Sequence, residues 1–198
     1  MTGRMTIALA VVAVALFVAA SCFAAPKLEI GAQAPGFSGT GVDDQEHSLD
    51  DYKDAKAVVL VFTCNHCPVA KAYEDRLIQL QKDYKSKGVQ VVALCVNDRD
   101  GDRLPGMKTR AEEKGFNFPY IYDETQQSAR EYGATCTPHI FLLCPKRRIA
   151  YQGAIDDNNN PDKVEKHFLR DAIDAVLAGK EVAEPVTKQR GCSIKWSK

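Results

Sequence analysis

The junction between an apolar run and two closely spaced cysteines constrains the fold of this chain more than any other sequence feature. The run AVVLVF at residues 57–62 is followed by Cys64 and Cys67, and from Pro68 apolar residues recur at spacings of three and four until Gly88. A short unbroken apolar run is typical of a strand buried on both faces, and the later spacing predicts an amphipathic helix. The sequence therefore places two cysteines where a buried strand turns into a helix.

The rest of the chain continues the alternation of strands and helices. A second buried strand is predicted over residues 89–97, parallel to the first because a helix connects them. Before the first strand, residues 30–56 predict an N-terminal hairpin or an irregular entry. Later patterns predict, in order, a helix over 107–114, a strand within 116–123, a helix over 124–133, two antiparallel strands over 139–144 and 147–155, and a helix over 164–177. This order predicts an α/β fold: a mixed central sheet with helices on both faces and an N-terminal hairpin extension.

The first residues predict export. Arg4 is followed by an uncharged, mostly apolar stretch that lasts until Lys27, and small residues lie at its end. This pattern is typical of a secretory signal, with cleavage before Ala25. The alternatives are a retained membrane anchor, since the stretch is just long enough to span a bilayer, and lipidation at Cys22. Each alternative places the domain outside the cytoplasm, in the periplasm or anchored to the membrane.

Length and charge limit the possible partners. A chain of 198 residues is long enough for one domain with a substantial core. We therefore expect a signal peptide over 1–24, one domain over 25–185 and a C-terminal tail over 186–198. Lys plus Arg equals Asp plus Glu, at 26 each, so no basic surface is predicted and nucleic acid is not an expected partner.

The cysteines fall into two groups. Removal of Cys22 leaves six, and Cys95 and Cys144 end apolar runs, where a free cysteine packs as a small hydrophobic residue. Four cysteines remain as candidates for chemistry: Cys64, Cys67, Cys136 and Cys192. Cys136 and Cys192 are possible auxiliary thiols, and a packed or structural role is the alternative for each.

A cysteine at the start of a helix is chemically activated. If the helix begins at or just after Cys64, its dipole favours the thiolate, and His66 adds a hydrogen bond or a positive charge. We therefore expect a lowered pKa for an exposed Cys64, with the better buried Cys67 as the resolving sulfur. Stabilisation of the reduced form predicts a disulfide that is easier to reduce than one with Gly-Pro between its cysteines.

A proline directly before a strand is the second candidate feature of the site. In GATCTPHIF, Pro138 follows a predicted short helix and precedes a predicted strand. A cis peptide there would place a backbone edge against the cysteines, and an ordinary trans proline is the alternative.

With these motifs identified, the chain resembles thioredoxin-fold proteins, and most of all the peroxiredoxin-like branch of the AhpC/TSA superfamily. The segments that carry the resemblance are CNHCPVAKAYEDRL, FPYIYDETQQSAREYGATCTP and GCSIKW. The resemblance implies that Cys64 and Cys67 are the redox pair and that Pro138 is the cis-proline. It also implies that Thr137 offers its backbone to a substrate strand.

Three functions follow as hypotheses. The first is an exported thiol–disulfide oxidoreductase that acts on protein or small-molecule disulfides and thiols, with no bound cofactor or resident metal. The second is a peroxidase with antioxidant activity, although Val61 stands where such enzymes carry a threonine three residues before the reactive cysteine. The third is a copper(I) or zinc module, in which His139 or Cys136 joins the two cysteines as ligands.

Overall fold

A computed structural model describes residues 28–197 of the chain. The predicted signal peptide over 1–24 lies outside the described residues, as does Lys198. None of the helices between residues 28 and 197 is both long enough and apolar enough to cross a membrane.

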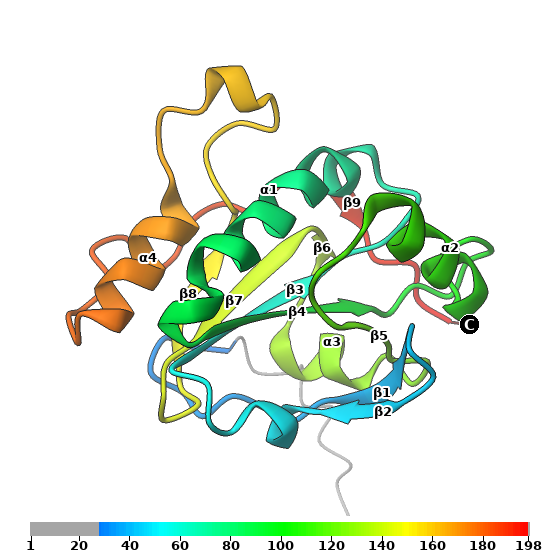
Figure 1. Cartoon of the computed structure of the whole chain (residues 1–198), viewed down its shortest axis with the longest axis horizontal. Helices are drawn as coiled ribbons and strands as arrows, with labels where there is room; N and C mark the ends of the chain where they lie inside the picture. Colours follow the sequence, from blue (N-terminus) through cyan, green and yellow to red (C-terminus); the bar gives the residue numbers. More distant parts are fainter. Residues whose placement is uncertain (1–27, 198) are drawn as a thin grey trace, which may run out of the picture.

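One mixed sheet of seven strands forms the centre of the molecule (Figure 1). Its strands, in spatial order, are β2 (Glu46–Ser48), β1 (Ser38–Gly41), β5 (Tyr120–Tyr122), β4 (Val89–Cys95), β3 (Ala57–Phe62), β7 (His139–Leu143) and β8 (Ile149–Gly153). Strand β4 runs parallel to β3 and β5, whereas β7 runs antiparallel to β3. The parallel centre therefore comes from the β3–helix–β4 unit that the sequence predicts.

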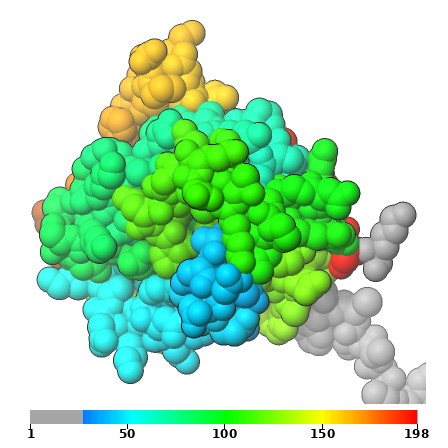
Figure 2. Space-filling view, turned by 45° about the vertical axis from the view of Figure 1, so that its right-hand side comes forward, coloured from blue at the N-terminus to red at the C-terminus, as the bar shows by residue number. Residues whose placement is uncertain are grey.

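Helices cover both faces of this sheet (Figure 1). In the part of the chain that the structure describes, the α-helices are α1 (Pro68–Tyr84), α2 (Leu104–Lys114), α3 (Gln127–Tyr132) and α4 (Phe168–Leu177). Short 3₁₀ turns are η1 (Leu49–Tyr52), η2 (Lys85–Lys87) and η3 (Pro161–Lys163). The segment that contains η3 projects beyond the rest of the surface (Figures 1 and 2).

The alternation of side chains along β3 divides the core between the two faces. Val59 and Val61 face a cluster that includes buried residues of α1, α2 and α4. Leu60 and Phe62 face the other cluster, with α3 and the N-terminal entry. Because every residue of β3 is buried, its apolar run has no polar alternation, as the sequence indicates.

The predicted fold class is confirmed, and so are the N-terminal hairpin and the antiparallel β7–β8 pair. The hairpin is not separate from the sheet, because β1 also pairs with β5. The last helix begins at Phe168 rather than at residue 164. The Asp157 carboxylate accepts hydrogen bonds from the amides of Glu165 and Lys166, which holds this segment outside the helix.

The structure also contains a second, two-stranded sheet that the sequence did not predict. Strand β6 (Cys136–Thr137) pairs antiparallel with β9 (Cys192–Ser193) of the C-terminal tail. The register sets Thr137 opposite Cys192 and Cys136 opposite Ser193. The sequence predicts no regular structure for the tail. In the structure, the tail pairs with the segment Cys136–Pro138, which we call the proline loop.

Candidate active site

The turn between β3 and α1 brings the two predicted redox cysteines to the carboxyl end of the parallel strands. Helix α1 begins at Pro68, and Cys67 is its N-cap residue. The Cys67 sulfur accepts a hydrogen bond from the Ala70 amide, at 3.5 Å. The helix N-terminus therefore acts on Cys67, and the expectation that Cys64 occupies this position is wrong.

The expected difference in exposure between the sulfurs is also absent. Cys64 is 2% exposed and Cys67 is fully buried. The two residues between them, Asn65 and His66, are half-buried. Thr63, directly before Cys64, is also buried, and so is Tyr120, whose hydroxyl donates to the Asn65 side chain. An exposed Cys64 is therefore a second point that the structure corrects.

Thr137 contacts both sulfurs. Its hydroxyl lies 3.0 Å from the Cys64 sulfur, and its carbonyl oxygen lies 3.1 Å from the Cys67 sulfur. The Thr137–Pro138 peptide bond is cis, as predicted from the sequence. The structure therefore brings together four of the predicted site residues, Cys64, Cys67, Thr137 and Pro138.

The two thiols influence each other's ionisation. The pKa of Cys67 is lowered to about 4, because the Cys64 thiol donates a hydrogen bond to the Cys67 sulfur. The same bond raises the pKa of Cys64, and burial and the negative charge of Asp102 act in the same direction. The pKa values of the two thiols are thus shifted in opposite directions, and that of Cys64 is raised rather than lowered as the sequence predicts.

A buried carboxylate holds the turn between the cysteines. Asp102 is fully buried and accepts hydrogen bonds from the Asn65 amide at 2.8 Å and the His66 amide at 3.0 Å. The His66 ring, through Nδ1, and the Asn97 side chain also bond to Asp102. Asp102 lies in a segment whose sequence is typical of a solvated loop, and no spacing signal in that loop distinguishes it from Asp98 or Asp100.

His66 therefore pairs with Asp102 through Nδ1. The sequence predicts instead that the ring acts on the Cys64 sulfur. Its Nε2 atom is buried and has no hydrogen-bond partner among the described residues. Because Asp102 brings a negative charge close to Cys64, the net effect of this pair on the Cys64 thiolate is not the predicted stabilisation.

One group of side chains could hold a metal ion. Ligand atoms of Cys64, His66 and Asp102 all lie within 4.8 Å of one another. Within residues 28–197 this group includes neither His139 nor Cys136, the ligands predicted from the sequence. A metal would also have to displace hydrogen bonds that the Asp102 carboxylate already accepts.

His139 is part of the core. It is 5% exposed, its ring lies against that of Phe141 at 4.5 Å between centroids, and burial lowers its pKa to about 4. A neutral, stacked histidine in β7 is a packing residue. Cys95 is likewise fully buried, as predicted, whereas Cys144 is only half-buried at the end of β7.

The auxiliary thiols differ in their relation to the pair. Cys192 packs against the buried cluster that contains Cys64 and Cys67, and hydrogen bonding with Cys192 contributes to the lowered pKa of Cys67. Cys136 instead donates to the Pro138 carbonyl, at 3.6 Å. All six cysteines of the described region are free thiols.

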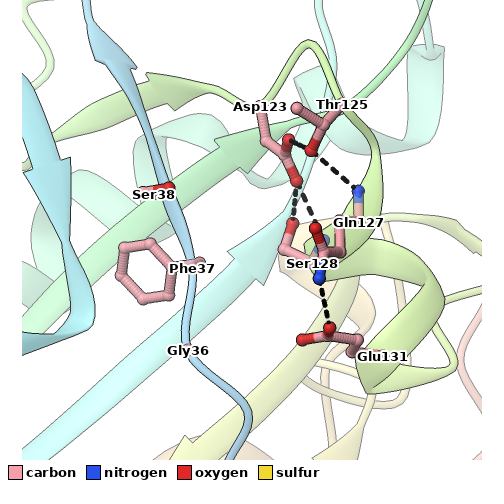
Figure 3. Close-up of a pocket in the computed structure, with 8 residues that line it drawn as sticks. All are labelled: Gly36, Phe37, Ser38, Asp123, Thr125, Gln127, Ser128 and Glu131. Carbon is pink, nitrogen blue, oxygen red and sulfur yellow. Dashed lines mark hydrogen bonds between the residues drawn. The ribbon is translucent and has the colours of Figure 1, made fainter.

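A separate hollow lies on the other side of the sheet, between β1 and α3 (Figure 3). Asp123 accepts hydrogen bonds there from the amide and hydroxyl of Ser128 and from the Thr125 hydroxyl. These bonds cap the start of α3, so the polar groups of Asp123 are used within the fold. No residue predicted for the redox site lines this hollow.

The chain is similar to several known proteins. Thiol-disulfide oxidoreductase ResA of Bacillus thuringiensis (strain Al Hakam) is 29% identical over 126 residues, which cover 64% of this chain and 70% of ResA. The crystal structure of an uncharacterised conserved protein from Geobacillus kaustophilus has 39% identity and a TM-score of 0.80, and the match covers 87% of this chain and 94% of that one. A protein from Chlorobium tepidum described as thiol:disulfide interchange protein DsbE has 27% identity and a TM-score of 0.64, over 76% of this chain and 99% of its own.

The family assignment rests on a match to a family model. The sequence model of the AhpC/TSA family matches residues 30–152, which contain Cys64, Cys67 and Pro138. The Geobacillus relative extends the similarity to most of the chain. The chain therefore belongs to the AhpC/TSA family and has a thioredoxin-like fold.

Proposed function

We propose that this protein is a thiol–disulfide oxidoreductase in which Cys64 and Cys67 alternate between a dithiol and a disulfide. The observation that carries the proposal is that two closely spaced cysteine sulfurs both contact Thr137, beside the cis Pro138. The names of the ResA and DsbE relatives support the same reaction class. Substrates would be protein or small-molecule disulfides and thiols.

Thr137 can stabilise the arrangement in which the proton has moved. When Cys67 takes the proton from Cys64, the new Cys67 thiol can donate to the Thr137 carbonyl, 3.1 Å away. The new Cys64 thiolate can accept from the Thr137 hydroxyl, 3.0 Å away. In this proposal Cys67 is the general base that activates Cys64, and Thr137 lowers the free energy of the reactive state.

The reaction then follows from thiolate exchange. The Cys64 thiolate attacks one sulfur of a substrate disulfide, a mixed disulfide forms, and the other substrate sulfur leaves as a thiolate that takes up a proton. Cys67 gives up its proton and attacks the Cys64 sulfur, which releases the second substrate thiol. The substrate gains two electrons and the Cys64–Cys67 pair loses them; the reverse sequence oxidises a dithiol.

Asp102 and His66 act as positioning residues in this proposal. Asp102 fixes the two backbone amides between the cysteines and the His66 ring, so the turn keeps the sulfurs together. A cavity of about 130 Å³ borders Pro138 and Val69 at the first turn of α1. We propose that this cavity binds the substrate group next to the attacked sulfur.

The decisive experiment is reduction of insulin disulfides by the reduced protein with the variant Cys64→Ser. We expect the rate to fall at least about a hundredfold, because serine cannot form the mixed disulfide. Cys144→Ser is the matched control, since Cys144 is a half-buried thiol outside the site and its loss should leave the rate unchanged. An undiminished rate in the Cys64→Ser protein would remove Cys64 from the mechanism.

Peroxide reduction is the alternative that the same thiol permits. Val61 is buried in β3, so the hydroxyl nearest to Cys64 comes from Thr137. Stopped-flow mixing of reduced protein with hydrogen peroxide distinguishes the two functions, because a dedicated peroxidase would oxidise Cys64 within milliseconds to a sulfenic acid. We propose slow oxidation and a preference for disulfides.

We also propose that the protein acts outside the cytoplasm. The support is the charge and apolar pattern of residues 1–24, which is typical of a signal peptide. Cell fractionation with N-terminal sequencing of the purified protein tests both export and cleavage before Ala25.

A further inference from the structure

We infer that Cys192 is a third redox-active thiol, which exchanges into the Cys64–Cys67 disulfide at the Cys67 sulfur. This inference rests on the proposed function, because that function supplies the disulfide. It adds a second disulfide, Cys67–Cys192, and gives the C-terminal tail a chemical role.

The strand register directs the Cys192 side chain toward the pair. Thr137 and Cys192 are opposite each other in the antiparallel β6–β9 ladder, so their side chains lie on the same face. The Thr137 side chain reaches the Cys64 sulfur on that face. The neighbouring pair, Cys136 and Ser193, points to the opposite face. The fold therefore selects Cys192 over Cys136 as the partner of Cys67.

The tail is held firmly enough to keep Cys192 in place. Ile194 is 4% exposed and packs in the core cluster around α3. The Lys195 amide donates to the Asn97 side chain at 2.8 Å, and the Asp98 amide donates to the Lys195 carbonyl at 2.9 Å. Arg130 lies over the Trp196 ring, 4.4 Å from its centroid. Asn97 also bonds to Asp102, so one residue links the tail to the turn that carries the cysteines.

Gly191 permits the close approach of the tail to the proline loop. A Cβ atom at this position would lie 2.0 Å from the Thr137 carbonyl oxygen and 3.0 Å from the Pro138 nitrogen. Both are backbone atoms that cannot rotate away. The backbone edge of Thr137, predicted from the sequence to receive a substrate strand, thus carries the chain's own residues Gly191–Ser193.

The exchange conserves atoms and electrons. The Cys192 thiolate attacks the Cys67 sulfur of the Cys64–Cys67 disulfide; the Cys67–Cys192 bond forms as the Cys64–Cys67 bond breaks. Cys64 leaves as a thiolate and takes up a proton, which balances the proton that Cys192 loses. The number of disulfides is unchanged, so no further oxidant is needed. In the product, Cys64 is a free thiol and the disulfide joins Cys67 to Cys192 of the tail.

Trapping the second disulfide tests the inference. Reduced Cys64→Ser protein is incubated with glutathione disulfide, quenched with acid, alkylated and mapped by mass spectrometry of its peptides. We expect an intramolecular Cys67–Cys192 disulfide with release of two glutathione thiols. Cys64→Ser/Cys136→Ser should form the same bond, and Cys64→Ser/Cys192→Ser should not. A folded Cys64→Ser protein in which Cys67 pairs with Cys136, or forms no internal disulfide, overturns the inference.

A tail variant provides a second, independent measurement in the presence of Cys64. Gly191→Val should push β9 away from Thr137, so oxidised Gly191→Val protein should contain the Cys64–Cys67 disulfide and lose the Cys67–Cys192 species found in the wild type. Equal amounts of that species in both proteins would contradict the proposed geometry. Insulin reduction by the wild type separates the two proposals. Turnover without any Cys67–Cys192 disulfide would contradict only this inference. Absence of turnover would contradict the proposed function.

Discussion

The CNHC turn, Cys64–Cys67, is contacted from two sides, and the two sides contact different parts of it. On one side, the loop from Asn97 to Asp102 contacts the backbone of Asn65 and His66 through a buried carboxylate. On the other side, the β6–β9 ladder contacts the sulfur atoms through Thr137, and its Cys192 packs against the same cluster. The first side holds the backbone of the turn, and the second supplies the polar groups that contact the sulfurs.

Loss of the Asp102 carboxylate should have the largest effect of any change to the first side. Asp102→Ala leaves the buried amides of Asn65 and His66 and the Asn97 side chain without an acceptor, so we expect the free energy of unfolding to fall by about 3 kcal/mol or more. Urea unfolding followed by circular dichroism measures it.

The matched control lies in the same loop. Asp100 is fully exposed, so Asp100→Ala should change the unfolding free energy by less than about 0.5 kcal/mol. If the two variants are equally stable, the loop does not hold the turn and the comparison between the two sides fails.

Removal of the Thr137 hydroxyl tests the second side with a smaller expected effect. Thr137→Val keeps the β-branched shape and the carbonyl but removes the donor to the Cys64 thiolate. We expect about tenfold slower insulin reduction, as one such hydrogen bond to a charged group is worth about 1.5 kcal/mol. Stability should change little compared with Asp102→Ala.

Thr135→Val provides the control for this variant. Thr135 is exposed and precedes β6, and its hydroxyl accepts from Gln189 rather than from a sulfur. Its replacement should leave the rate near that of the wild type. Equal slowing in both variants would show that the Thr137 effect comes from disturbance of the strand.

The smallest expected change is in the thiolate signal of the reduced wild type between pH 8 and pH 5.5. Because the pKa of Cys67 is lowered to about 4, absorbance of the thiolate at 240 nm should stay nearly constant over this range and fall as the pH approaches that value. Cys67→Ser should lack this plateau. A wild-type signal that titrates near the ordinary cysteine pKa of about 8.5 would contradict the lowered pKa of Cys67.

The same shift has a consequence for stability, with a defined sign. A thiol whose pKa is lower in the folded state stabilises the fold above its unfolded pKa, and this contribution is lost as the pH falls toward the folded pKa. The reduced wild type should therefore lose stability relative to Cys67→Ser as the pH falls from about 8.5.

Particular residues show how far sequence reasoning reaches. The strand over residues 57–62, the helix from Pro68 and the cis Pro138 are all present where the patterns place them. Burial of a continuous apolar run and one-sided helical spacing are local properties, so they can be read from neighbouring residues. The helix start is local too, but the proline after Cys67, a residue favoured in the first helical turn, was a better indicator of the N-cap than the position of Cys64.

Asp102 and Cys192 were not predictable in the same way. Asp102 is one of three aspartates in a loop of polar residues, and only the fold buries it between Asn97 and His66. Cys192 is 125 residues from Cys67 along the chain. Their proximity depends on the β6–β9 ladder, which consists of two residue pairs and leaves no periodic signal.

By itself, the sequence determined the α/β order of elements and the two cysteines at the end of a buried strand, since both depend on short-range patterns of apolar residues, glycines and prolines. The family followed from the resemblance of whole segments to known proteins. Only the tertiary structure decided that the pKa of Cys67 is lowered and that of Cys64 is raised. These shifts depend on hydrogen-bond donors and a carboxylate brought together from four separate segments of the chain: the CNHC turn, the Asn97–Asp102 loop, the proline loop and the C-terminal tail. Electrostatic energies act through space and fall with distance, so they follow from the folded arrangement rather than from the order of residues.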